Sequence, residues 1–157
     1  MLIPHSMMYT REQIEAKIHA ALEILQQKDA PLLENDVNER SLTHKLAEYL
    51  QKEFLNYHVD CEYNRMTDDN GVQIVKRFPP ESVMTDDTEG RTVYPDIIVH
   101  DRSSRDRNLL ILEVKKHADR QEKQRDVEKL RMYIDSLHYE HAYFIDFSDS
   151  SCIPERV

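Results

Sequence analysis

Two short apolar segments near the middle of the chain constrain its fold more than any other feature. They are residues 94–100 (YPDIIVH) and 109–116 (LLILEVKK), separated by DRSSRDRN, a charged stretch that predicts a solvent-facing turn. Together they predict an antiparallel hairpin with one face formed by Ile97, Val99, Leu110, Leu112 and Val114. The other face is formed by Ile98, Leu109 and Ile111. A hairpin that is apolar on both faces lies in the centre of a sheet and is covered by helices.

Three segments with helical spacing supply the helices that such a sheet needs. The first covers residues 10–28 and begins with Thr10 and Gln13 in the capping-box pattern. The second begins around residues 35–38, and its apolar stripe consists of Leu42, Leu46, Leu50 and Phe54. The third begins at Asp119, with Glu122 three residues later, and its expected core stripe consists of Val127, Leu130, Ile134 and Leu137.

The remaining elements are strands. Residues 59–66 alternate in polarity and continue through the turn Asp69-Asn70-Gly71 into a second strand at 72–78, while residues 142–147 (AYFIDF) predict a buried strand. Residues 79–93 are polar and predict a surface loop. The order of elements predicts an α/β fold with a mixed four- to five-stranded sheet flanked by helices. A chain of 157 residues has the length of one domain, so we expect residues 1–157 to form a single domain.

Composition excludes several classes of protein. Gly71 and Gly90 are the only glycines, so the chain has neither a P-loop nor a Rossmann dinucleotide loop. The formal net charge of −9 argues against a protein that coats nucleic acid by bulk attraction. Cys61 and Cys152 form no CxxC pair, and the sequence MLIPHSMMYT lacks the apolar run of a secretory signal, so we expect a cytoplasmic protein that does not enter a membrane. Cys61 is expected to be a core thiol.

Two carboxylates interrupt the apolar hairpin at one corner. If its turn is centred between Ser104 and Arg105, Asp96 lies opposite Glu113, and Lys115 points to the same side as Glu113. Facing carboxylates repel one another and are costly to bury unless a cation or proton intervenes. Oxygen ligands suit Mg²⁺ or Mn²⁺ better than zinc. Glu39 lies on the apolar stripe of the second helix and is expected to face the sheet.

These residues resemble the PD-(D/E)xK nuclease superfamily over residues 35–147. The resemblance consists of Glu39 in NERSLTHKLAEYL, then Tyr94-Pro95-Asp96-Ile97-Ile98, then Glu113-Val114-Lys115. It implies a restriction endonuclease-like fold in which a helix, three antiparallel strands, a helix and a fourth strand follow one another, with a core that resembles Holliday-junction resolvases. It also implies a Mg²⁺-dependent nuclease acting on DNA, in which Asp96, Glu113 and Glu39 bind Mg²⁺ or Mn²⁺ and Lys115 assists the attacking water. The helix at 10–28 and an insertion at 67–93 depart from the resolvase pattern.

Basic residues are concentrated in one part of this acidic chain. Residues 101–131 contain ten Lys or Arg against seven Asp or Glu. The expected phosphate contacts are Arg65, Lys76, Arg77, Arg91, Lys116, Arg120, Lys123, Arg125 and Lys129. For each of these residues, an ordinary solvated position is the alternative. A catalytically inactive nuclease-like module that binds nucleic acid or a protein partner is the alternative for the whole chain. A homodimer is an alternative to a monomer, and its candidate surface is the exposed side of helix 10–28.

Overall fold

The structure is a computed structural model that describes residues 8–34, 39–62, 65–67, 73–75, 77–78, 91–92, 94–148 and 152–157. Its helices are α1 (Arg11–Lys28), α2 (Ala30–Glu34), α3 (Glu39–Glu53) and α4 (Arg120–Leu137). Its longer strands are β1 (His58–Cys61), β6 (Ile97–Asp101), β7 (Ser104–Lys115) and β8 (His141–Asp146). Its shorter strands are β2 (Arg65–Thr67), β3 (Gln73–Val75), β4 (Arg77–Phe78), β5 (Arg91–Thr92) and β9 (Glu155–Arg156).

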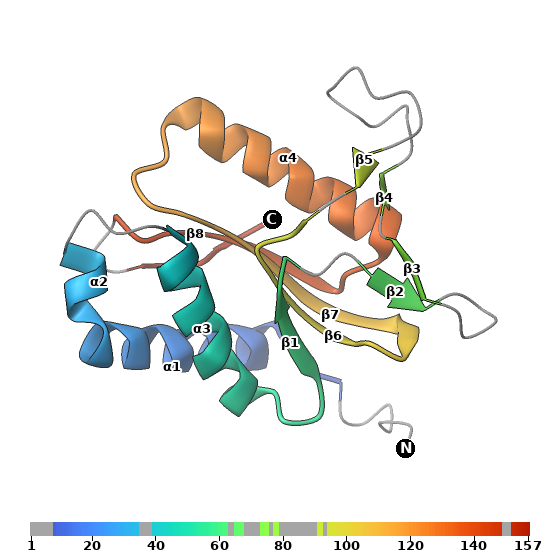
Figure 1. Cartoon of the computed structure of the whole chain (residues 1–157), viewed down its shortest axis with the longest axis horizontal. Helices are drawn as coiled ribbons and strands as arrows, with labels where there is room; N and C mark the ends of the chain where they lie inside the picture. Colours follow the sequence, from blue (N-terminus) through green and yellow to red (C-terminus); the bar gives the residue numbers. More distant parts are fainter. Residues whose placement is uncertain are drawn as a thin grey trace.

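A mixed five-stranded sheet with the order β1-β6-β7-β8-β9 forms the centre of the molecule. β7 runs parallel to β8, and the other neighbouring strands are antiparallel. The α4 helix lies on one face of the sheet, and α1 and α3 lie on the other (Figure 1). The expected α/β architecture, a mixed sheet flanked by helices, is confirmed, and the predicted hairpin occupies its interior. None of the helices in the described ranges has the length and apolar content needed to cross a membrane.

The register of the central hairpin agrees with the sequence prediction where the apolar residues meet. Ile97 pairs with Leu112 and Val99 pairs with Leu110, as expected. The predicted turn position is wrong, because β7 already begins at Ser104 and Asp101 pairs with it. Register shifts on both sides of His100 account for the difference between the predicted and the observed position of the turn. Such a bulge adds residues to one strand without moving the pairs beyond it.

Both faces of the hairpin are buried, as predicted. Ile97, Val99, Leu110 and Leu112 pack in the core beneath α1 and α3. On the opposite face, Ile98 and Ile111 pack against α4. Leu109 was expected beside Ile111 but belongs to the α1 and α3 side. Leu109 is the residue skipped between the pairs Val99–Leu110 and His100–Asn108, so the bulge turns its side chain to the other face.

The helix boundaries follow the predicted caps. The Thr10 hydroxyl accepts a hydrogen bond from the Gln13 backbone, and the Gln13 side chain accepts one from the Thr10 backbone. Asp119 caps α4 by accepting a hydrogen bond from the Glu122 backbone at 2.8 Å. The buried stripe of α4 differs from the prediction, because it consists of Asp126, Leu130, Tyr133 and Leu137. Val127 and Ile134 are only partly buried. The short α2 helix was not predicted.

The region between β1 and β6 differs from the expected strand order. The predicted strand at 59–66 is divided between β1, which joins the main sheet, and β2, which pairs with β3 in a separate sheet. The second predicted strand, 72–78, is divided between β3 and β4. β2 and β3 pair in antiparallel orientation as expected, since Arg65 pairs with Val75, and the predicted turn Asp69-Asn70-Gly71 lies outside the described residues. Most of the predicted loop at 79–93 lies outside the described residues. Its residues 91–92 form β5, which pairs with β4, so the loop prediction is wrong at that end.

Candidate active site

Asp96 and Glu113 lie at the same end of the central hairpin. Asp96 directly precedes β6 and Glu113 follows Leu112, the last paired residue of β7 on this side. A backbone contact fixes the Asp96 carboxylate, because its Oδ2 accepts a hydrogen bond from the Val114 N–H at 2.9 Å. The two carboxylates therefore lie close together where the strand pairing ends, with Asp96 half-buried.

Glu113 is an acidic side chain in surroundings that disfavour its charged form. Its side chain is 2% exposed on the face of the sheet that α4 covers, and its Oε1 has no hydrogen-bond partner among the described residues. Burial, followed by the nearby Asp96 carboxylate, raises the pKa of Glu113 well above its ordinary value. A buried acid of this kind needs a proton or a cation close by.

The α4 helix supplies Asp126, which the sequence prediction did not place here, and Lys129, which was expected to contact phosphate. Asp126 is 4% exposed, and its Oδ2 is also without a hydrogen-bond partner in the described part of the chain. The Lys129 Nζ lies 3.4 Å from Asp126 Oδ1 and 3.9 Å from Glu113 Oε2. Burial and the charges of Glu113 and Asp96 together raise the pKa of Tyr133. The spacing of Asp126, Leu130 and Tyr133 on one helical face is a signal that could have located this group.

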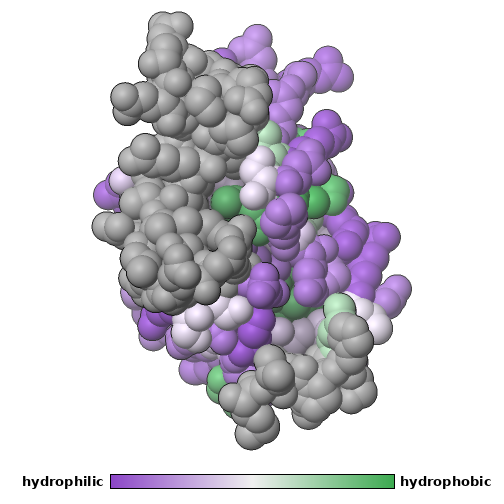
Figure 2. Space-filling model, turned by 90° about the vertical axis from the view of Figure 1, so that its right-hand side faces the viewer, coloured by the Kyte–Doolittle hydropathy of each residue, from purple (hydrophilic) through white to green (hydrophobic). Residues whose placement is uncertain are grey.

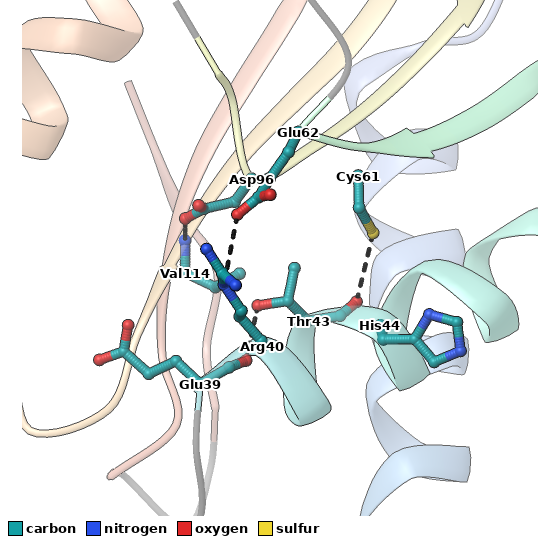
Figure 3. Close-up of a pocket in the computed structure, with 8 residues that line it drawn as sticks. All are labelled: Glu39, Arg40, Thr43, His44, Cys61, Glu62, Asp96 and Val114. Carbon is teal, nitrogen blue, oxygen red and sulfur yellow. Dashed lines mark hydrogen bonds and ion pairs between the residues drawn. The ribbon is translucent and has the colours of Figure 1, made fainter.

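Glu39 and Asp96 line a common pocket of about 350 Å³ at the open side of the site. Glu39 is the first residue of α3, and its Oε1 accepts a hydrogen bond from the Lys116 N–H at 3.3 Å. In Figure 3 the carboxylates of Glu39 and Asp96 extend toward the same side of the pocket, whereas Arg40 points toward Glu62. The inward orientation predicted for Glu39 agrees with this position.

Cys61 also lines this pocket, together with Thr43 and His44. It is exposed, so the expectation of a core thiol is wrong. Cys61 ends β1 at the edge of the sheet, where its side chain reaches the carbonyl of Thr43 instead of the core.

The basic residues named from the sequence occupy different environments. Lys115 ends β7 half-buried and shares its strand face with Glu113, while Arg120 and Arg125 are exposed on α4. Lys123 is bound to Glu155 at 2.7 Å, and the Lys116 backbone holds Glu39. Lys129 faces the buried carboxylates. Lys76 and the side chains of Arg65, Arg77 and Arg91 lie outside the described residues.

The donor atoms present suit a hard divalent cation with few protein ligands. Within the described ranges, no three acidic, histidine or cysteine side chains converge closely enough to form a complete metal cage. Magnesium usually retains several waters and binds proteins through one or two carboxylates. Glu113, with its unpartnered oxygen beside Asp96, offers such a pair. The residues therefore fit Mg²⁺ or Mn²⁺, with water completing the coordination.

We compared the chain with known protein families, with curated proteins and with solved structures. None of the three comparisons found a match. The side chains gathered around Glu113 are therefore the basis on which a function is assigned.

Proposed function

We propose that this protein is a metal-dependent, endonuclease-like phosphodiesterase that hydrolyses DNA and has a PD-(D/E)xK, restriction endonuclease-like fold. One observation carries the proposal: a buried glutamate with an unpartnered oxygen lies beside a second carboxylate, two residues before a lysine. The order α3, β1, β6, β7, α4, β8 supports the fold assignment. With the four short strands β2–β5 between β1 and β6 set aside, this order matches the succession of helix, three antiparallel strands, helix and strand on which the resemblance depends.

Each residue of the site has a distinct part in this proposal. Asp96 and Glu113 would hold Mg²⁺ or Mn²⁺. Glu39 would face Asp96 across the pocket on the α3 side, whose lining residues do not include Glu113. When bound, such a metal polarises a phosphate and lowers the pKa of a coordinated water. The Lys115 ammonium would stabilise the negative charge that develops on the phosphate oxygens. The Val114 N–H keeps the Asp96 carboxylate oriented throughout.

The surface supports a polyanionic substrate that is bound by a local group of basic side chains. Among the residues that are coloured by hydropathy in Figure 2, hydrophilic ones predominate and hydrophobic ones form small separate patches. Arg120 and Arg125 are exposed on α4. Because the whole chain carries a net charge of −9, attraction to phosphates has to come from such local groups. We therefore expect binding of DNA to weaken steeply as salt is raised.

A cleavage assay with matched variants tests this function. The protein is incubated with supercoiled, single-stranded and branched DNA in the presence of Mg²⁺ or Mn²⁺, and separately with EDTA. We expect cleavage that EDTA abolishes and that Asp96→Asn and Lys115→Gln each reduce at least about 100-fold, the usual scale for loss of a transition-state contact. Asp135→Asn and Lys52→Gln, which change exposed residues outside the site, are the matched controls. Cleavage that persists in Asp96→Asn contradicts the proposal.

A second candidate function follows from the position of Lys129. Its ammonium already lies near both Glu113 and Asp126 and partly neutralises them without a metal. This arrangement favours a catalytically inactive nuclease-like module that binds nucleic acid or a protein partner. For such a module, DNA binding would be independent of divalent metal and unchanged in Asp96→Asn, which an electrophoretic mobility assay in EDTA measures.

A further inference from the structure

Lys129 is held at a position that a lysine on a helix surface does not ordinarily occupy. It lies one helical turn after Asp126, and its Nζ reaches Asp126 Oδ1 at 3.4 Å and Glu113 Oε2 at 3.9 Å. Both carboxylates are more than nine-tenths buried, whereas the lysine side chain is 39% exposed. The ammonium thus enters a buried acidic site from the solvent side of α4.

The ammonium leaves part of the acidic site unsatisfied. Glu113 Oε1 and Asp126 Oδ2 are both buried without a hydrogen-bond partner in the described part of the structure. Glu113 belongs to β7 and Asp126 to α4. The Lys129 ammonium approaches the second oxygen of each carboxylate, Glu113 Oε2 and Asp126 Oδ1. A single ammonium, with one positive charge, therefore lies near two buried acids. A third carboxylate, that of Asp96, is close to Glu113.

We propose that the Lys129 ammonium occupies the place of a divalent cation in the metal-free protein, so that ammonium and metal exclude one another between Asp126 and Glu113. Asp126, which was not named from the sequence, thereby becomes the carboxylate that pairs with Glu113 at this cation, with water supplying the remaining ligands. This inference rests on the metal site of the proposed function. The flexible four-carbon stem of lysine lets the ammonium leave for solvent when the metal enters.

Displacing the ammonium costs part of the affinity for metal. The metal must break the contacts of Lys129 with Asp126 and Glu113 before it binds. Removing the ammonium should therefore tighten metal binding, whereas a lysine that only supports the local structure should, when removed, leave metal affinity unchanged or weaken it. For a partly exposed ion pair we expect a change of roughly tenfold in the dissociation constant.

Calorimetric titration of the full chain with Mn²⁺ alone, after treatment with EDTA and at about pH 8, tests this competition. Lys129→Met should bind Mn²⁺ roughly tenfold more tightly than the wild type, and Asp126→Asn should bind it more weakly. Lys129→Arg keeps the charge and should stay close to the wild type. Lys123→Met is the matched control, because Lys123 is also an ion-paired lysine of α4 but binds Glu155 outside the site.

A measurement on the unmodified sequence keeps the inference testable if Lys129→Met does not fold. The protein is acetylated briefly with an amine-reactive reagent with and without Mg²⁺, and labelled lysines are quantified by mass spectrometry. Metal should increase labelling of Lys129 several-fold and leave labelling of Lys123 unchanged.

The outcomes separate this inference from the proposed function. Binding of Mn²⁺ by the wild type, with Lys129→Met equal or weaker and Lys129 labelling insensitive to Mg²⁺, overturns the inference and leaves the metal site standing. Binding by Lys129→Met but not by the wild type supports the competition and contradicts a metal-dependent activity. Absence of binding in both proteins overturns both proposals.

Discussion

Replacing Glu113 with glutamine should stabilise the metal-free protein progressively as the pH is raised. Glu113 is 2% exposed, and burial together with Asp96 raises its pKa well above the ordinary 4.5. Between 4.5 and the raised pKa, the folded wild type holds a proton that the unfolded chain has already lost. The wild type therefore loses stability as pH rises through this window, and Glu113→Gln, which has no charge there, does not.

The size of the effect follows from proton linkage. One proton of difference between the folded and unfolded states changes the free energy of unfolding by about 1.4 kcal/mol per pH unit. We expect the stability of Glu113→Gln relative to wild type to increase by at least about 1 kcal/mol between about pH 5 and about pH 8. Other titrating groups contribute almost equally to both proteins and cancel in the difference.

Urea unfolding in EDTA, followed by far-UV circular dichroism because the chain contains no tryptophan, measures this difference. Glu23→Gln makes the same chemical change at an exposed position of α1 and should stay within about 0.5 kcal/mol of wild type at every pH. A difference between Glu113→Gln and wild type that is flat, or that shrinks as pH rises, refutes the reasoning.

Two further predictions concern groups outside the carboxylate site. Asp119→Ala removes the cap of α4 and should lower the free energy of unfolding, measured by urea unfolding, by about 1 kcal/mol. Asp119→Ser keeps a capping side chain and should retain most of the stability that the cap gives. Burial disfavours the charge of Asp60, but hydrogen bonds from His100 and Arg102 outweigh burial and lower its pKa below the ordinary 3.8. Asp60→Asn should therefore cost about 2 kcal/mol at neutral pH, and this cost should shrink progressively as pH falls from about 4 toward the lowered pKa of Asp60, which acid unfolding curves of the two proteins would show.

The register of the active-site hairpin could be predicted although its turn could not. The apolar residues on both strands specify their own pairing, because a slip by one residue would move Ile97 and Leu112 out of the core. The turn between them is charged and carries no such constraint. The structure places it two residues earlier and absorbs the difference around His100 and Leu109. A prediction based on burial therefore succeeds from the pair Ile97–Leu112 to the pair Val99–Leu110 and fails near the turn.

The α4 face could be predicted only in part, because polar residues occupy its centre. Leu130 and Leu137 define the helical stripe, and a purely apolar pattern then adds Val127 and Ile134. The helix is instead rotated so that Asp126 and Tyr133 are buried. Both side chains lie near Glu113 of β7, and this proximity is a tertiary contact. Local periodicity contains no information about such a contact.

The two candidate functions share one fold and differ only in what neutralises Glu113. A leucine at this position would suit the surrounding core of Ile98, Ile111 and Leu130 and would avoid the cost of burying a charge. If Lys129 were the permanent partner of Glu113, replacing both residues together by apolar ones should preserve or increase stability, as it often does for buried ion pairs. If the site binds metal, the same replacement should remove the stabilisation that Mn²⁺ gives to the wild type, because the ligand is then lost. The change in melting temperature on adding Mn²⁺ to both proteins therefore distinguishes a structural ion pair from a metal site in which a lysine holds the place of the metal.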